Sequence, residues 1–252
     1  MTTPRVPILM YHKVGATIDG SPDPFINVSS ISFERQMLLM SRLGYVTVTF
    51  AEAVAGLKGQ LKLPRRCFAV TFDDGYCCVG EHALPILSKF GFSGTVFAVS
   101  GAVGRENAWD HANGKPVHPL MSWDQLKKLR SSGWEIGCHT KTHPRMDGIE
   151  DKVALAELIE SKALVEERIG GSAQTFCYPY GLFNKQTPAL VEAAGYTGAC
   201  TTRSGIASDS SNAFLLPRVK VSHSDGVAGL LYKLNLRPML PTLRKRRHGV
   251  GF

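Results

Sequence analysis

Short apolar runs alternate with segments of helical pattern along most of this chain, and this alternation limits its possible folds more than any other feature. Neighbouring parallel strands need a long crossover connection, which is usually a helix. The expected strands are residues 6–11, 67–72, 94–99, 134–138, 174–178, 197–201 and 215–221, and the expected helices are residues 32–43, 80–90, 122–132, 150–169 and 184–194. The pattern predicts an α/β fold with a parallel sheet, which about seven such units could close into a barrel.

The size and the cysteines of the chain indicate an ordinary globular protein. A chain of 252 residues is long enough for one α/β barrel and can bury a large core without disulfide bonds. Its six cysteines form no Cys-x-x-Cys pair, and no run approaches the roughly 18 apolar residues of a membrane-spanning helix. The opening residues MTTPRVPILMYH do not resemble a signal peptide, so we expect a cytoplasmic location.

The positive charge of the chain is concentrated at its C-terminal end. The formal net charge is +8, and residues 226–252 hold six of the 29 lysines and arginines but none of the 21 acidic residues. The other 23 basic residues nearly balance the acids, so no nucleic acid is expected as a partner. We therefore expect a globular domain at residues 1–225 and a basic amphipathic tail at residues 226–252.

The composition of this tail allows two interpretations. Its apolar side chains and its cations are Leu230, Leu231, Leu234, Leu236, Arg244, Lys245, Arg246 and Arg247, among others. They fit a solvated, frayed chain end. They also fit a peripheral contact with the anionic inner face of a membrane, in which the leucines enter the lipid interface.

Two adjacent aspartates follow one of the apolar runs, in the stretch AVTFDDGY at residues 69–76. Because successive residues of a strand point to opposite sides, one of Asp73 and Asp74 can bind a cation while the other stays free. The stretch HTKTHP follows the run at 134–138 and adds His139 and His143. The carboxyl ends of parallel strands form the ligand site of α/β folds, and two imidazoles with one carboxylate make an open catalytic metal site.

Each of these motifs also has an ordinary structural interpretation. DDG alone is common in solvated turns, and HTKTH alone could be a surface loop. Their joint position at strand ends within one α/β chain favours the metal site.

With these motifs, the sequence resembles the polysaccharide deacetylase family, that is, the NodB-homology domain of carbohydrate esterase family four. The resemblance rests on TFDDG, on HTKTHP with MSWDQLKKLRSSGWEIGC before it, and on FCYPYG at residues 176–181, and it covers most of residues 6–223. It implies a distorted (β/α) barrel of the NodB type. It also implies a divalent metal, most often zinc, and hydrolysis of N- or O-acetyl groups on sugars.

The resemblance also implies a role for individual residues. By position, Asp73 resembles the general base, and Asp74, His139 and His143 resemble the metal ligands. Tyr180 falls where a backbone amide of the family helps to hold the oxyanion.

The third motif departs from the family pattern. Many members have an arginine there that contacts the base, whereas this chain has Cys177. A subgroup that deacetylates poly-N-acetylglucosamine instead has an N-terminal Y-H-x-V motif and a later Pro-Arg, and this chain is similar to it, with YHKV at residues 11–14 and Arg218 after a proline. By this resemblance Arg218 substitutes for the missing arginine and His12 is the general acid. His223, which is nearer the usual position of the acid, is the alternative.

The expected activity is metal-dependent removal of N-acetyl groups from a glycan or glycan precursor that contains N-acetylhexosamine, with release of acetate. An O-acetyl esterase acting on an acetylated polysaccharide would use the same site. A third possibility is an inactive barrel that binds a nucleic acid or a membrane through its tail. The complete set of Asp73, Asp74, His139 and His143 argues against this third possibility.

Overall fold

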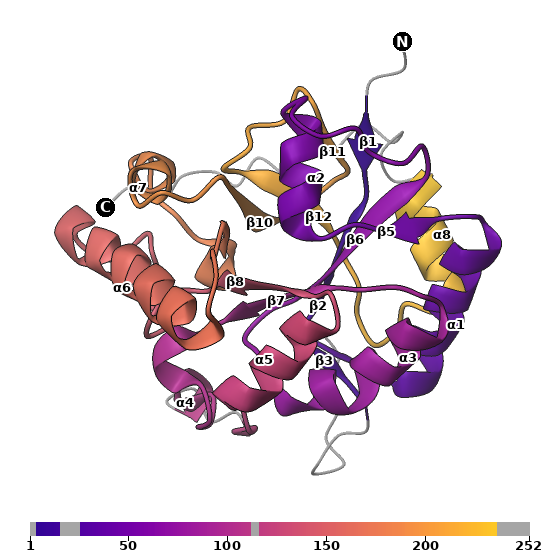
Figure 1. Ribbon diagram of the computed structural model, residues 1–252, viewed down its shortest axis with the longest axis horizontal. Coiled ribbons are helices and arrows are strands. Elements are labelled where there is room, and N and C mark those ends of the chain that lie inside the picture. Colours follow the sequence, from indigo (N-terminus) through magenta and orange to yellow (C-terminus); the bar gives the residue numbers. More distant parts are fainter. Residues whose placement is uncertain (1–3, 16–25, 112–115, 236–252) are drawn as a thin grey trace, which may run out of the picture.

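Seven parallel strands close into a barrel in the computed structural model, which describes residues 4–15, 26–111 and 116–235 (Figure 1). Around the barrel the strands are β2 (Ile8–Tyr11), β6 (Cys67–Phe72), β7 (Thr95–Ala98), β8 (Glu135–Cys138), β9 (Thr175–Cys177), β10 (Gly198–Ser204) and β12 (Leu216–Lys220). Strand β2 closes the barrel because it pairs with both β6 and β12. The predicted α/β barrel of about seven units is therefore confirmed.

Helices cover the outside of the barrel, with α6 and α7 on one side and α1 and α8 on the other (Figure 1). The predicted helices correspond to α1 (Ser30–Arg42), α3 (Leu84–Lys89), α5 (Trp123–Ser131), α6 (Asp151–Ile169) and α7 (Thr187–Ala193). Ser29 caps α1, so this helix begins two residues before the expected start at residue 32. Pro85 is the second residue of α3, which continues directly from a π-helical turn at Val79–Ala83, and a turn of this kind accommodates a break in the helical hydrogen bonds.

Several short elements were not predicted. They are β1 (Arg5–Val6), β3 (Lys13–Val14), β4 (Asn27–Val28), β5 (Val46–Thr47), α2 (Phe50–Leu57), α4 (Ala108–His111), β11 (Ala207–Ser208), α8 (Val227–Asn235) and the 3-10 turns Ser100–Ala102 and Pro179–Gly181. Most are two to four residues long, which is too short for a periodic signal. Helix α2 did carry a signal, because Thr49 and Glu52 form a capping box.

A buried carboxylate lies at the amino-terminal ends of the barrel strands. Glu135, the first residue of β8, accepts hydrogen bonds from the backbone N–H of Ala51 at 2.8 Å and from the hydroxyls of Thr95 and Thr175 at 3.0 and 2.5 Å. These bonds connect α2 to strands β7, β8 and β9. Burial raises the pKa of Glu135, although the hydrogen bonds lower it in part.

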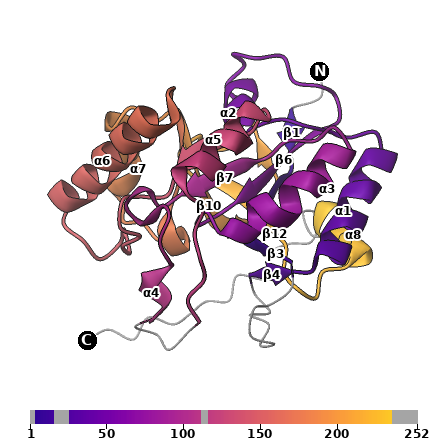
Figure 2. The ribbon, with the colours of Figure 1, turned by 60° about the horizontal axis from the view of Figure 1, so that its bottom comes forward.

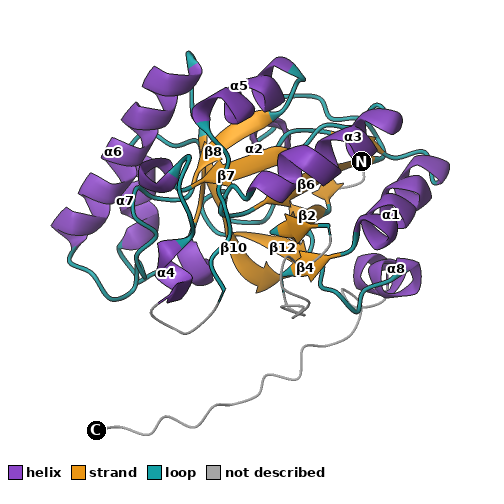
Figure 3. Cartoon of the chain, turned by 90° about the horizontal axis from the view of Figure 1, so that it is seen from below, coloured by secondary structure: helices purple, strands orange, loops and turns teal. Residues whose placement is uncertain are grey.

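Helix α8 packs against the barrel, although it lies within residues 226–252, the range predicted as a tail. It lies beside α1 (Figures 2 and 3), and the side chain of Leu230 is fully buried in the core. Lys233 forms an ion pair with Asp225 and donates to the carbonyl of Lys220. Leu230 is therefore not available for a lipid interface, while residues 236–252 of the predicted tail lie outside the described residues. Within the described part of the chain, no helix combines the length and the apolar character needed to cross a membrane.

Candidate active site

The predicted site residues meet at the carboxyl ends of the barrel strands. Asp73 and Asp74 follow β6, His12 follows β2, His139 follows β8, and Arg218 lies within β12. They border or support a pocket of about 110 Å³, which is lined by His12, Ile26, Asp73, Asp74, Trp109, Asp110, His139, His143, Tyr180 and Thr202. One small pocket thus gathers side chains from segments that are far apart in the sequence.

Asp74, His139 and His143 form a compact set of possible metal ligands. The Oδ1 atom of Asp74 lies 3.2 Å from Nε2 of His139 and 3.4 Å from Nε2 of His143. Ligand atoms about 2.1 Å from a tetrahedral metal lie about 3.4 Å from one another. All three side chains are buried, and their ligand atoms lie within 4.8 Å of one another. The spacing therefore fits a single divalent ion.

The protonation of His139 supports the same interpretation. Its Nδ1 lies 2.7 Å from the carbonyl oxygen of Cys177, which can only accept a hydrogen bond, so Nδ1 carries a hydrogen. In a neutral ring, Nε2 then presents a lone pair toward the Asp74 carboxylate. Two imidazole nitrogens face the same oxygen, and one cation between them would satisfy both contacts. The residues present therefore fit a metal.

The backbone holds these residues in a conformation that is uncommon for side chains other than glycine. Among the described residues, positive φ angles outside glycine occur at Asp74 (+71°), Thr140 (+64°), His143 (+63°) and Tyr180 (+58°). All four lie in loops at the carboxyl ends of the strands. Such strain costs on the order of 1–3 kcal/mol per residue and persists where the surrounding structure over-determines the conformation. The positions of both motifs are thus imposed by the fold around them.

Asp73 forms a buried ion pair with Arg218. The guanidinium donates from Nη1 to Oδ1 and from Nη2 to Oδ2, each at 2.7 Å, and both residues are almost completely buried. Arg218 is itself held by the carbonyl of Thr201 at 2.9 Å and by the hydroxyl of Thr71 at 3.0 Å. Burial alone would raise the pKa of Asp73, but the charge and hydrogen bonds of Arg218 lower it below its usual value. The position predicted for Arg218, in contact with Asp73, is the one found.

Cys177 completes a second group with Asp73 and His139 that could hold a metal by distance alone. Burial raises the pKa of the Cys177 thiol well above its usual value, and a thiol must lose its proton to bind a metal. The Cys177 sulfur also lies 3.2 Å from Nη2 of Arg218, and Asp73 is already paired with the same guanidinium. The set with Asp74 is therefore the better metal site.

The two candidate general acids lie in different surroundings. His12 lines the pocket, with its Nε2 3.8 Å from Oδ2 of Asp73. His223 is exposed and is not among the residues that line the pocket. The geometry therefore favours His12 as the proton donor.

Tyr180 lies at the rim of the pocket and is about half exposed. Its ring contacts the ring of His143 at a centroid distance of 4.7 Å and an angle of 65°. It belongs to the turn at Pro179–Gly181 that follows β9, so its backbone also borders the site. The role of its amide in holding the oxyanion stays a prediction.

Sequence reasoning missed Trp109 and Asp110, which the structure places in the wall of the pocket. Both belong to the short helix α4, which lies on the same side of the barrel as β3 and β4 (Figure 2). The segment at 101–121 had no helical or strand period to identify it. The Gly, His and Pro residues of this connection and its length are typical of a functional loop or insertion, but they do not single out either residue.

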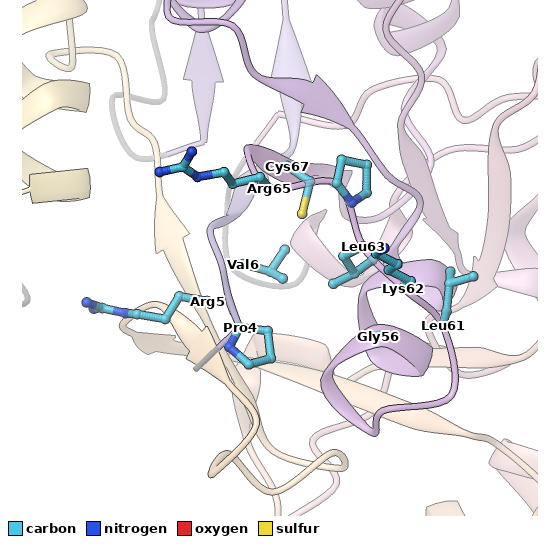
Figure 4. Close-up of a pocket in the computed structure, with 10 residues that line it drawn as sticks. Pro4, Arg5, Val6, Gly56, Leu61, Lys62, Leu63, Arg65 and Cys67 are labelled. Atoms are coloured by element: carbon cyan, nitrogen blue, oxygen red, sulfur yellow. The ribbon is translucent and has the colours of Figure 1, made fainter. Parts of the chain in front are cut away.

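A second hollow of about 440 Å³ lies at the opposite end of the barrel, near the start of β6 (Figure 4). It is lined by Pro4, Arg5, Val6, Gly56, Leu61, Lys62, Leu63, Pro64, Arg65 and Cys67. This lining contains no carboxylate and no imidazole, so the hollow lacks the acid–base and metal-binding groups that the smaller pocket gathers. The smaller pocket is therefore the candidate active site.

Comparisons with known proteins identify the family of the chain. A family model for polysaccharide deacetylase matches residues 60–199, which is more than half of the chain. The chain belongs to the polysaccharide deacetylase family. This deacetylase-family chain is 29% identical over 235 residues to the putative polysaccharide deacetylase YxkH of Bacillus subtilis (strain 168), a match that covers 93% of this chain and 77% of YxkH.

One further relative and one solved structure extend the comparison of this deacetylase-family chain. The chain is 26% identical over 207 residues to poly-beta-1,6-N-acetyl-D-glucosamine N-deacetylase of Staphylococcus aureus (strain MSSA476), covering 78% of this chain and 68% of that protein. The structure of Streptococcus pyogenes deacetylase PplD in complex with acetate superposes with a TM-score of 0.80 at 23% identity and covers 92% of this chain and 99% of PplD. The likeness to PplD confirms the fold.

Proposed function

We propose that this protein is a metal-dependent N-deacetylase that hydrolyses acetamido groups of a glycan or glycan precursor containing N-acetylhexosamine. The observation that carries the proposal is the joint placement of two sites around one pocket. Asp74, His139 and His143 form a possible metal site, and Asp73 with Arg218 lies beside it. Membership of the polysaccharide deacetylase family supports deacetylation of a polysaccharide as the reaction.

The side chains divide the work of amide hydrolysis among them. A divalent metal, which we expect to be zinc, would be held by Asp74, His139 and His143 and would supply Lewis acidity for the acetyl carbonyl and for the attacking water. The Asp73 carboxylate takes a proton from that water as it attacks. Arg218 keeps this carboxylate ionised and fixes its orientation.

The remaining groups act on the developing charge and on the leaving group. The backbone N–H of Tyr180 donates a hydrogen bond to the oxyanion that forms from the acetyl carbonyl. Protonated His12 transfers its proton to the leaving nitrogen, because an amine anion is too poor a leaving group without it. The products are acetate and a free amino sugar.

The choice of an N-acetyl over an O-acetyl group rests on His12. An alkoxide leaves more easily than an amine anion, so an esterase has less need of a proton donor in the pocket. The histidine at the pocket edge, 3.8 Å from Asp73, therefore supports an amide substrate. The named activity of the S. aureus relative on poly-beta-1,6-N-acetyl-D-glucosamine supports the same choice.

The deciding experiment measures acetate release from chitooligosaccharides and from acetyl-xylan, with and without a chelator. We expect release from the chitooligosaccharide, loss of release after chelation, and recovery on addition of Zn²⁺. Release from acetyl-xylan alone would identify an O-acetyl esterase. Release that is indifferent to chelation would exclude a metal mechanism.

The same proposal includes the location of the reaction. A deacetylase in the cytoplasm needs a substrate on its own side of the membrane, and a lipid-linked sugar or glycan precursor would meet that need. Peripheral contact with an anionic membrane would bring the enzyme to such a substrate.

A further inference from the structure

The two histidines of the possible metal site are supported in different ways. A metal-binding histidine normally donates its second ring N–H to a carbonyl or carboxylate, which fixes the ring and raises its basicity. His139 follows this rule through the carbonyl of Cys177. The Nδ1 atom of His143 is also buried, yet it has no hydrogen-bond partner within the described part of the chain. In this part of the chain, contacts other than a hydrogen bond at Nδ1 therefore have to supply the second support of the His143 ring.

Aromatic rings surround His143 instead. The Trp109 ring is stacked on the imidazole, with a centroid distance of 4.3 Å and an angle of 27° between the planes. The Tyr180 ring approaches at 4.7 Å and 65°, and the His139 ring at 4.9 Å and 65°. Of these three contacts, only the one with Trp109 is a parallel stack, which defines the plane of the imidazole.

Asn107, which is fully buried, lies directly before α4, the helix that carries Trp109. The Asn107 amide accepts a hydrogen bond from the backbone N–H of His118, so its NH₂ group must point the other way. That group donates to the Asp110 carboxylate at 2.7 Å and to the Tyr76 hydroxyl at 3.3 Å. Asn107 thereby connects Asp110 of α4 to His118 and to Tyr76, which lies in the turn after β6.

Two backbone bridges hold the same segment. Glu106 pairs with Pro119, and Tyr76 pairs with Leu120, so the residues on either side of α4 are attached to each other and to the turn after Asp74. A short helix of four residues has little stability of its own. These attachments keep Trp109 over His143.

We propose that Trp109 is a positioning residue for the metal site, and that its stacking on His143 replaces the missing second hydrogen bond of that ligand. This inference rests on the proposed metal site. Loss of the stack leaves the imidazole free to turn about its χ2 bond, so the cation must order the ring when it binds. The Trp109 ring also shields the ligand from water.

The first test measures the affinity of the purified, metal-free protein for Co²⁺ and Zn²⁺ by competition with a chromophoric chelator. We expect Trp109→Ala to weaken binding about 10- to 100-fold, the range typical of altered partners of metal ligands, and Trp109→Phe to restore most of it. Trp123→Ala is the matched control, because Trp123 is also half-buried but lies on α5, and this variant should bind as the wild type does. A folded Trp109→Ala protein with wild-type affinity would overturn the inference.

The second test does not depend on the stability of an alanine variant. The chain has three tryptophans, and a bound Co²⁺ ion should quench Trp109 most strongly because its ring stacks on a ligand. We expect the quenching to be lost in Trp109→Phe and kept in Trp123→Phe and Trp134→Phe. Quenching that persists in Trp109→Phe would contradict the inference. Absence of Co²⁺ and Zn²⁺ binding in the wild type would instead overturn the metal site itself, and the inference with it.

Discussion

The guanidinium of Arg218 and the carboxylate of Asp73 form a two-point ion pair, with both N–O distances at 2.7 Å, inside the wall of the barrel. Arg218 has no exposed surface, and its Nε donates to the carbonyl of Thr201. A buried pair of this kind depends on each partner, because removal of one leaves an uncompensated charge at a cost of about 3–5 kcal/mol. The pair therefore sets both the charge and the direction of the proposed base.

Replacement of Arg218 by lysine should slow the reaction and change its pH dependence. A lysine ammonium cannot reproduce the two parallel hydrogen bonds, so we expect a loss in kcat of about 10- to 100-fold. Arg218 lowers the pKa of Asp73, so its weakening raises that pKa, and the acidic limb of the pH–rate profile should move to higher pH. Metal affinity should not change, because Arg218 does not contact the proposed ligands. An unchanged acidic limb would show that Asp73 is not the base that titrates.

The sequence predicted the contact between Arg218 and Asp73 but not its geometry. The motif resemblance identified an arginine to replace the one absent at Cys177. In the structure, Cys177 on β9 and Arg218 on β12 both lie beside Asp73, and the Cys177 sulfur lies 3.2 Å from the guanidinium. Residues on β9 and β12 come together only when the barrel forms, and a local sequence pattern carries no information about that contact.

Removal of either imidazole from the metal site should abolish tight metal binding. We expect His139→Ala and His143→Ala to lose most of the bound metal, since each removes one of three protein ligands. Metal content by mass spectrometry of the purified proteins is the measurement. His223→Ala is the control, because this exposed histidine lies outside the pocket lining. Full metal content in both ligand variants would refute the site.

His12→Ala should harm amide substrates more than activated esters. The leaving amine needs a proton, whereas nitrophenolate leaves without one, so we expect a loss of about 10²- to 10⁴-fold on a chitooligosaccharide and a small loss on nitrophenyl acetate. Both rates are measured on the same protein preparation. An equal loss on the two substrates would remove the acid role from His12, and the same comparison with His223→Ala would then test the alternative.

The sequence identified side chains with a motif and missed those without one. DDG and HTKTH have recognisable spacing, and their strands were located by apolar runs. Trp109 and Asn107 lie in a segment without a period, and their role depends on contacts with His143, Tyr76 and His118. Contacts of this kind exist only after the barrel has formed.

The buried carboxylate of Glu135 should make stability depend on pH. Its folded-state pKa is raised, so the folded protein holds this proton more tightly than the unfolded chain, and ionisation costs stability as the pH rises above about 4.3. Glu135→Gln can keep acceptors for Ala51 and Thr95 and donate to Thr175. We therefore expect the free energy of unfolding of Glu135→Gln, relative to that of the wild type, to increase as the pH rises from 4 to 7.

Urea unfolding of both proteins at several pH values measures this difference. Glu135→Ala is the contrasting variant, because it leaves buried donors without an acceptor. Its free energy of unfolding should fall by at least about 3 kcal/mol at every pH. A constant difference between the wild type and Glu135→Gln across this range would contradict the prediction.

The C-terminal region should divide into a structural part and a part that can be removed. Leu230 is fully buried and Lys233 is paired with Asp225, so Leu230→Ala should lower the free energy of unfolding by about 2–5 kcal/mol, and deletion of residues 227–252 should destabilise the barrel. The sequence alone could not separate these roles. An amphipathic leucine pattern is the same whether a helix packs on a protein or on a lipid surface.

Deletion of residues 236–252 is therefore the variant that tests membrane contact, since it keeps Leu230 and the Lys233 ion pair. The removed segment contains the run Arg244, Lys245, Arg246 and Arg247, and each cation gains about 1 kcal/mol near an anionic leaflet. We expect the full chain to sediment with anionic vesicles at low salt and to be released at high salt. The shortened chain should stay in the supernatant with its melting temperature and its activity on soluble substrate unchanged. Sedimentation that is the same with neutral vesicles, or that survives the deletion, would show that this run does not bind an anionic membrane.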